Sequence, residues 1–254
     1  MKTIISEYTA NYETYSFGYT IYALPTAWEY DQAYTQGYLP YTASLDIEQS
    51  VFYLCRSLRV DTKVFENNSE NRRIIRKAQE HDLSVIFYDK ADFDIADPKF
   101  REFCLGFAQS RFSHGGLTRE RFDYILSRDY VNTIVEIRSS GRIIGYDVLC
   151  MWVSYVHHFF CFYDTDMVEA LPLGKYLMRY TIDRAKSQNI DYVYLGTCYN
   201  TGWLYKARDF AAIQRRDGNS RQTDLDQLKE LCKSDTETKI QDQFKSSPKQ
   251  FWVK

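Results

Sequence analysis

The alternation of apolar and polar positions predicts several strands in the first ninety residues. Residues 16–25 form a short apolar run that ends at Pro25, which indicates a strand or extended segment. Residues 51–64 alternate and are rich in β-branched side chains, so they predict a second strand. A third strand is expected over residues 83–89. The N-terminal part of the chain therefore contributes to a sheet.

Three segments in the first half are candidate helices. The first covers residues 70–82, a short helix or turn, and Ser69 before it is the expected N-cap. The second opens at Pro98 and has the apolar spacing of an amphipathic helix. The third follows Thr118, whose hydroxyl is the expected cap. Helices are thus interleaved with the early strands.

From Val131 the pattern changes to three consecutive apolar strands that end near Asp164, with a hairpin turn at residues 139–141. A helix over residues 173–190 and a buried strand over residues 191–199 follow. This order predicts an α/β (α+β) fold, an acetyltransferase-like mixed sheet flanked by helices, rather than a Rossmann fold.

These patterns divide the chain into three parts. Residues 1–80 are expected to form a smaller N-terminal α/β subdomain, and residues 81–214 the acetyltransferase-like domain. Residues 215–254 are polar and charged and are expected to form a partly helical or mobile tail. Leucines 225, 228 and 231 favour a short amphipathic helix there, and the apolar 251–253 segment is a candidate for docking onto the body.

Composition limits the classes of partner. The chain has 254 residues, 44% of them hydrophobic, and a formal net charge of −2, so a sizeable core is available and an overall basic nucleic-acid binder is excluded. Contact with RNA would require a local basic patch. The six cysteines contain no C-x-x-C pair and histidine is scarce, so no zinc site is expected.

The N-terminal residues are too polar for a signal peptide, and no apolar run is long enough to span a bilayer. The sequence therefore predicts a cytoplasmic protein with reduced thiols, no membrane contact and no DNA partner, acting as a monomer.

One stretch of the second half carries a recognisable series of motifs: Phe162-Tyr163-Asp164, Leu173-Gly174, Tyr192-Val193-Tyr194-Leu195-Gly196, Tyr205-Lys206 and Phe210. Their order and spacing resemble the C-terminal domain of arginyl-tRNA–protein transferases and of bacterial relatives that append leucine to protein N-termini. The N-terminal half is similar more loosely, through residues 15–19 and the L-R-V run at residues 58–60. The likeness covers roughly residues 12–210.

The sequence also departs from that family. Only Cys55 stands where the family carries an N-terminal cysteine cluster, so a metal or iron–sulfur site of that kind is not expected. Thr165 replaces the proline of F-x-D-P, and Pro172 replaces the serine of S-L-G. A divergent branch with a changed substrate is one consequence of these differences.

The resemblance implies a reaction in which an aminoacyl group moves from a charged tRNA to the α-amine of a protein or peptide, with no further cofactor. The donor ester is already activated, so positioning and proton transfer carry the reaction. Asp164 and Tyr194 are the expected catalytic residues. Asp164 would serve as base or bind the incoming amine, and the alternative is an aspartate that only caps locally.

Other residues are expected to bind the substrates. Those assigned to the substrate itself are Tyr192, Gly174, Lys175, Tyr205, Lys206 and Asp147. Tyr192 and Tyr194 would stack on the terminal adenosine, or else pack against the helix over residues 173–190. Those assigned to tRNA phosphates are Arg72, Arg73, Arg76, Lys77 and Arg208, with Arg215-Arg216 as further candidates; the alternative for the first cluster is a solvated helix face. His157 and His158 are expected on opposite faces, one of them in solvent.

Two other functions remain open. An acyl-CoA–dependent N-acyltransferase would share the fold, but the helix start at residues 169–176 lacks the Q/R-x-x-G-x-G/A pattern that cradles a pyrophosphate. If Gly174 is taken as either glycine, Glu169 or Leu171 falls at the Gln/Arg place. The third possibility is a non-catalytic binding module, which the changes at Thr165 and Pro172 motivate.

Overall fold

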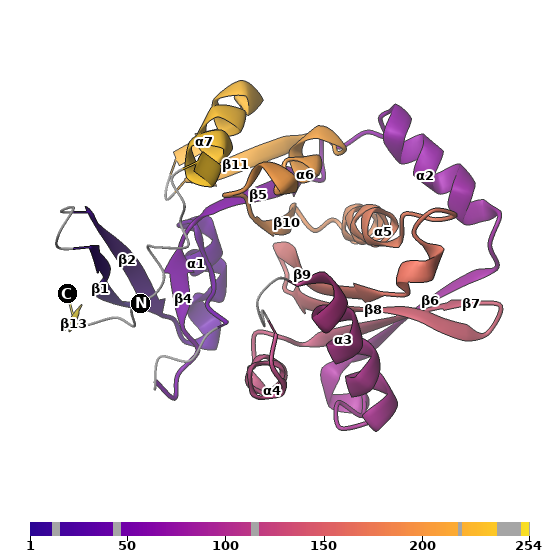
Figure 1. The fold of residues 1–254 in the computed structure, drawn as a ribbon, viewed down its shortest axis with the longest axis horizontal. Helices are drawn as coiled ribbons and strands as arrows, with labels where there is room; N and C mark the ends of the chain where they lie inside the picture. The colour runs from indigo at the N-terminus through magenta and orange to yellow at the C-terminus, as the bar shows by residue number, and fades with distance from the viewer. Residues whose placement is uncertain (12–15, 43–46, 113–116, 218–219, 238–249, 254) are drawn as a thin grey trace.

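The computed structural model describes residues 1–11, 16–42, 47–112, 117–217, 220–237 and 250–253. Its elements form two sheets with helices around them (Figure 1). The smaller sheet has the strand order β13-β1-β2-β4-β3 and is antiparallel throughout. Its strands are β1 (Lys2–Asn11), β2 (Ser16–Leu24), β3 (Tyr38–Pro40), β4 (Phe52–Leu54) and β13 (Gln250–Val253), and α1 (Tyr30–Thr35) connects β2 to β3.

The larger sheet has eight strands in the order β12-β11-β5-β10-β9-β8-β7-β6. All neighbours are antiparallel except β10 and β9, which run parallel. The strands are β5 (Arg56–Asp61), β6 (Leu83–Asp89), β7 (Thr133–Ser139), β8 (Arg142–Met151), β9 (Tyr155–Tyr163), β10 (Tyr192–Thr197), β11 (Ile213–Asp217) and β12 (Ser220–Gln222). This mixed sheet confirms the predicted fold class.

Helices pack on both faces of the larger sheet. The helices are α2 (Ser69–Gln79), α3 (Pro98–Arg111), α4 (Arg119–Ser127), α5 (Leu173–Ser187), α6 (Tyr205–Arg208) and α7 (Leu225–Glu237). Side chains of α3 and α4 share one buried cluster with β8, and side chains of α5 and α7 share another with β5 and β10. Apolar burial on both faces is the main stabilising contribution.

Several local expectations are confirmed. Thr118 caps α4 by accepting a hydrogen bond from the Arg121 amide. Ser140 and Gly141 both have positive φ in the tight turn between β7 and β8. The apolar segment near the C-terminus pairs with β1 as β13, and a helix forms around Leu228. Tyr15 of the N-terminal motif lies outside the described residues.

Three expectations are corrected. The predicted strand over residues 51–64 is two strands in different sheets, separated at Cys55. The N-cap of α2 is Asn68, whose side chain accepts from the Asn71 amide, because the helix begins one residue earlier than expected. The expected partly helical or mobile tail begins instead as strand: Arg215 and Arg216 lie in β11, which pairs with β5 and leads into β12.

The predicted boundaries at residues 80 and 214 stay a prediction. β5 lies before the first of them and pairs within the larger sheet, between β10 and β11. Among the described residues, no helix combines the length and the apolar character needed to cross a bilayer.

Candidate functional site

A cavity of about 950 Å³ opens where β9 and β10 separate. The two strands pair in parallel only from Tyr192 opposite Tyr155 to Tyr194 opposite His157. The next residues of both strands line the cavity, from His157 to Cys161 on β9 and from Leu195 to Thr197 on β10. Where two parallel strands separate, their backbone groups and side chains face a common space. A substrate in that space can contact both strands.

Each strand carries a bulge at this point. The register of β9 shifts so that Leu149 faces His158 while Val148 faces Phe160, which makes Phe159 the extra residue. The register of β10 shifts between Tyr194 and Gly196, and Gly196 has φ +81°. Bulges bend strands and re-aim their side chains, so these two shape the cavity wall.

Lys206 supplies the amine of the site. Its Nζ donates to the Leu195 carbonyl over 2.7 Å, at the bulge of β10. Burial lowers the pKa of Lys206 to about 8, and the neighbouring Cys198 opposes that shift. A lysine with this pKa is partly neutral near pH 8, where an ordinary lysine is almost fully protonated.

His157 lies beside Lys206. A Cβ built on Gly196 would be 3.6 Å from the lysine Nζ and 3.8 Å from His157 Nε2. The other ring nitrogen of His157, Nδ1, is 2.9 Å from the Tyr34 hydroxyl. Burial lowers the pKa of His157 to about 3, so the ring is neutral. Both histidines are buried, at 3% and 4% exposure, and the expectation that one meets solvent is wrong because helices cover both faces of β9.

The start of α5 forms another wall. A Cβ on Gly174 would lie 3.0 Å from a ring carbon of Tyr163, so the glycine permits the close approach of helix and strand. Lys175 lines the cavity and its Nζ is held 2.6 Å from Asp209 and 3.2 Å from Glu70. Tyr205 also lines the cavity, and burial raises its pKa to about 12.

Replacing Gly174 by alanine is expected to destabilise the fold by about 1 kcal/mol, because the Tyr163 ring must shift by a few tenths of an ångström. Gly106 is a matched control: it lies exposed within α3 with nothing near its Cβ position. Gly106→Ala should instead stabilise by about 0.5–1 kcal/mol. Urea unfolding of both variants measures the contrast, and equal effects would contradict the close approach.

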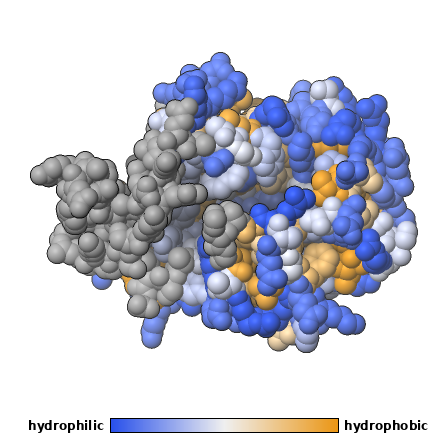
Figure 2. Space-filling view, in the orientation of Figure 1, coloured by the Kyte–Doolittle hydropathy of each residue, from blue (hydrophilic) through white to orange (hydrophobic). Residues whose placement is uncertain are grey.

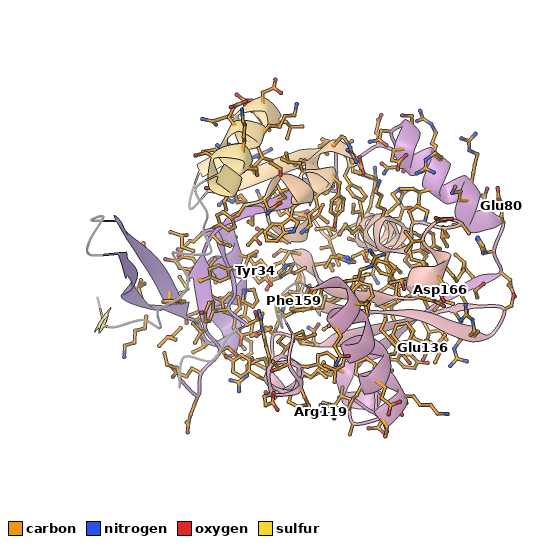
Figure 3. The ribbon with its side chains drawn as sticks, viewed as in Figure 1. Tyr34, Glu80, Arg119, Glu136, Phe159 and Asp166 are labelled. Atoms are coloured by element: carbon orange, nitrogen blue, oxygen red, sulfur yellow. The ribbon has the colours of Figure 1, made fainter. Side chains whose placement is uncertain are left out.

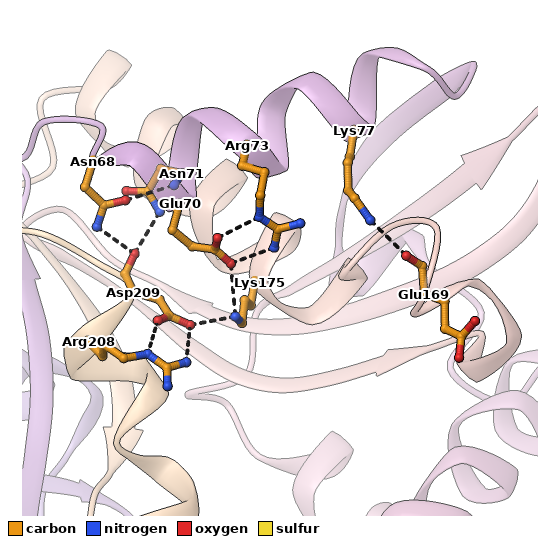
Figure 4. Close-up of polar contacts among 9 residues, drawn as sticks. All are labelled: Asn68, Glu70, Asn71, Arg73, Lys77, Glu169, Lys175, Arg208 and Asp209. Carbon is orange, nitrogen blue, oxygen red and sulfur yellow. Dashed lines mark hydrogen bonds and ion pairs between the residues drawn. The ribbon is translucent and has the colours of Figure 1, made fainter.

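Four basic residues and two carboxylates from α2, α5, α6 and the residue after α6 meet beside the cavity (Figure 4). Glu70 binds Arg73 and Lys175, and Asp209 binds Lys175 and Arg208. The Lys77 amine, one turn further along α2, donates to the Glu169 carbonyl. The fold thus brings Arg73, Lys175 and Arg208, which were predicted from separate parts of the sequence, close to one another. The carboxylates of Glu70 and Asp209 link them through ion pairs.

The other candidate tRNA contacts divide into two groups. Arg72 and Arg76 are exposed on α2, beside the paired Arg73 and Lys77. Arg215 and Arg216 are buried in strand β11, and Arg216 donates to the Thr35 carbonyl. The expectation that this second pair faces phosphate is corrected, because its strand lies between β5 and β12 instead of forming a tail.

Asp164 makes the contacts of the capping alternative. One carboxylate oxygen accepts from the Asp166 amide over 3.0 Å, and the other lies 2.8 Å from Arg142. The catalytic role of Asp164 therefore stays a prediction, because Asp164 is not among the described residues that line the cavity.

Asp164→Asn provides the test. The amide oxygen can still cap, and the lost ion pair involves a 65% exposed Arg142, so stability should change by less than about 1 kcal/mol. Any transfer activity should stay near the wild-type rate. A large loss of activity without loss of stability would restore Asp164 as the base.

Tyr192 and Tyr194 do lie on one side of β10, and neither is among the described residues that line the cavity, although the Tyr194 ring lies edge-on to His157, which is. The Arg59 guanidinium lies 3.6 Å from the Tyr192 ring centroid and donates to the Tyr194 hydroxyl over 3.0 Å. Tyr194 also donates to the Tyr34 carbonyl. The intervening Val193 packs in the cluster that includes α5, so alternation points both tyrosines the other way.

Asp147 is buried beneath the cavity wall, in a group with His158 and Cys161. Its Oδ2 is 2.8 Å from His158 Nδ1. Burial raises the pKa of Asp147, an effect that His158 partly offsets, and burial also raises the pKa of the Cys161 thiol. His158 and Cys161 line the cavity, whereas Asp147 does not.

The remaining lining was missed by sequence reasoning. It is aromatic and cationic, and no Asp or Glu occurs among its described residues; the members not yet named include Phe107, Arg111, Phe112, Arg121 and Trp203.

Figure 3 places Phe159 and Tyr34 near the centre of the molecule, and His157 packs against both rings. Figure 2 shows hydrophilic residues along the upper edge, over α2 and α7, and apolar patches lower on the same face. Arg111 and Arg121 lie on separate helices, α3 and α4, so the spacing of residues in the sequence could not predict that they line one cavity.

Comparisons with known proteins agree with the motif series. Residues 90–206 match the family described as "Arginine-tRNA-protein transferase, C terminus". The resemblance drawn from the sequence is confirmed for this segment, and the match supports a transferase. Comparison with curated protein sequences gave no significant match.

Solved structures with similar folds are distant. One is a C-terminal domain assigned to a lysylphosphatidylglycerol synthetase of Agrobacterium fabrum (12% identity, TM-score 0.44, 72% of this chain and 55% of that one). Others are L-PGS from Bacillus licheniformis (12%, 0.42, 68% and 52%) and a conserved protein of unknown function from Bacteroides thetaiotaomicron (13%, 0.45, 74% and 64%). The chain spans between half and two thirds of these structures' lengths.

Proposed function

We propose that this protein transfers an aminoacyl group from a charged tRNA to the N-terminal α-amine of a protein or peptide. The observation that carries the proposal is the position of Lys206, from the family's Tyr-Lys motif, inside the cavity where β9 and β10 separate. The family match over residues 90–206 supports the same reaction class.

In the proposed reaction the neutral amine attacks the ester carbonyl carbon of the aminoacyl-tRNA. A C–N bond forms, the ester C–O bond breaks, and the terminal ribose oxygen leaves. Neutral Lys206 accepts the proton that the attacking nitrogen loses and then donates it to the ribose oxygen, which departs as a hydroxyl. Its pKa of about 8 matches that of a free α-amine, near 7.7–8.0, so this transfer is close to balanced in free energy.

The cavity lining favours a neutral, leucine-like donor over arginine. Arg111, Arg121 and Lys175 are the cations that line it, and the described lining residues include no carboxylate that would pair with an arginyl side chain. Burying an unpaired guanidinium among cations is costly, whereas the rings of Phe159, Phe160 and Trp203 accept an apolar side chain. The same cations suit the phosphates of the tRNA end.

Exposed arginines extend the cationic surface away from the cavity. Arg72 and Arg76 lie on α2, which is joined to the cavity wall through the Glu70–Lys175 ion pair. Their placement supports contact with the acceptor stem, so the net charge of −2 need not oppose RNA binding.

Calorimetry with stable donor mimics tests the proposal. Adenosine that carries a leucyl group in amide linkage at its 3′ position should bind, and the arginyl counterpart should bind more weakly. Acetyl-CoA is the comparison, because the acyl-CoA alternative requires it to bind. Saturable binding of acetyl-CoA together with no binding of either mimic would replace the proposal by that alternative.

A further inference from the structure

A group of three side chains beside the cavity, two of them buried and the third partly buried, has the composition of a metal site. Asp147 lies on β8, and His158 and Cys161 lie on β9. One ligand atom from each, a carboxylate oxygen, a ring nitrogen and the thiol sulfur, lies within 4.8 Å of the others. Asp147 and His158 were considered in the sequence analysis, but nothing in the sequence indicated that they lie together.

The bulge of β9 creates the group. His158 and Cys161 are three positions apart, and in a regular strand they would point to opposite faces. Because Phe159 is inserted, His158 faces Leu149 and Cys161 faces Asp147 across the β8–β9 ladder, and those two partners are two residues apart. Both side chains therefore lie on the face that α5 covers. C-x-x-C and His spacing rules cannot detect a site assembled in this way.

The polar atoms of the group have unmet bonding capacity. Asp147 is 1% exposed and His158 is 4% exposed. His158 Nδ1 lies 2.8 Å from Asp147 Oδ2, within ion-pair distance, but both carboxylate oxygens and both ring nitrogens lack a hydrogen-bond partner of good geometry. Buried polar atoms are rarely left in this state, and a buried carboxylate is especially costly.

We propose that Asp147, His158 and Cys161 bind one divalent transition-metal ion, zinc foremost. Carboxylate, imidazole and thiolate are the three zinc ligand types of proteins, with bonds of about 2.0–2.3 Å. Tetrahedral bonds of those lengths separate ligand atoms by about 3.3–3.8 Å, so small side-chain rotations bring this group onto an ion. His158 and Cys161 line the cavity, so the fourth coordination position faces the cavity.

Titration of the metal-free, full-length chain with zinc(II) tests the site without reference to transfer activity. The wild type is expected to bind one equivalent, and Cys161→Ser and Asp147→Asn are expected to lose that binding. Cys150→Ser is the control, since Cys150 is a cysteine of the neighbouring strand β8 that is fully buried and packs in the cluster on the Tyr34 side. Circular dichroism verifies that each variant is folded.

Spectroscopy of the wild type decides the question even if a variant fails to fold. Cobalt(II) should give thiolate charge-transfer absorption, and X-ray absorption of the zinc form should show one sulfur ligand at about 2.3 Å. Absence of stoichiometric binding, a bound ion without sulfur ligation, or binding that persists in folded Cys161→Ser would each overturn the proposal.

Discussion

Lys206→Met should lower kcat/KM for aminoacyl transfer by about 10²–10⁴, the range expected for loss of a general base. Methionine keeps the length of the side chain but can accept no proton. Lys206→Arg should be nearly as inactive, because a guanidinium holds its proton at any working pH. Rates of transfer to a short peptide under limiting substrate measure both variants. Near wild-type activity in Lys206→Arg would show that Lys206 acts only as a charge.

Stability provides the control for this variant. The folded-state pKa of Lys206 is lowered to about 8, whereas a lysine in the unfolded chain titrates near 10.4. The unfolded chain therefore binds more protons between those values, and the wild type gains stability as the pH rises from 8 to 10.4. Below pH 8 the buried charge is unfavourable, so Lys206→Met should be at least as stable as the wild type at pH 7. Urea unfolding at pH 7 and pH 10 checks this sign.

The second large effect is expected at Tyr34, which ties α1 to the cavity strands. Its ring is 1% exposed, stacks on Tyr155 at 3.9 Å and meets Tyr194 edge-on, while its hydroxyl bonds His157. Tyr34→Ala should destabilise the fold by about 3–5 kcal/mol, because it removes a large side chain from a packed core.

Two further variants separate the causes. Tyr34→Phe keeps the ring and leaves the buried His157 nitrogen without its partner, so it should cost about 1–3 kcal/mol. Trp28, on η1 (Ala27–Glu29), is 96% exposed, and Trp28→Ala should change stability by less than about 0.5 kcal/mol. Equal losses for Tyr34→Ala and Trp28→Ala in urea unfolding would contradict the packing described here.

The sequence was informative where its signals are local. Apolar periodicity predicted α3, α5 and the β7–β9 meander, and the Tyr-Lys motif located Lys206. The N-cap of α2 is Asn68 and not the expected Ser69. A difference of one residue is typical, because a cap depends on one or two side chains and helix ends are defined only to within one or two residues. The motif series predicted the resemblance that the family match over residues 90–206 confirms.

Long-range pairing was harder to predict. Residues 51–64 look like one strand, yet Cys55 divides them between two sheets, since their partners come from the first forty residues and from β10 and β11. Arg215 and Arg216 look solvent-exposed in sequence and are buried in β11. The bulge at Phe159 has no sequence signature, and it determines which β9 side chains reach the cavity and which meet Asp147.

The proposed function places the transfer of an amino acid from tRNA to a protein N-terminus in the cavity between β9 and β10. The most direct measurement incubates the protein with one charged tRNA at a time and a peptide, followed by mass spectrometry of the peptide. Leucyl-tRNA should add one leucine to a peptide with a free α-amine and none to its N-acetylated form, and Lys206→Met should abolish the addition. Recovery of unmodified peptide with every charged tRNA still intact would contradict the claim.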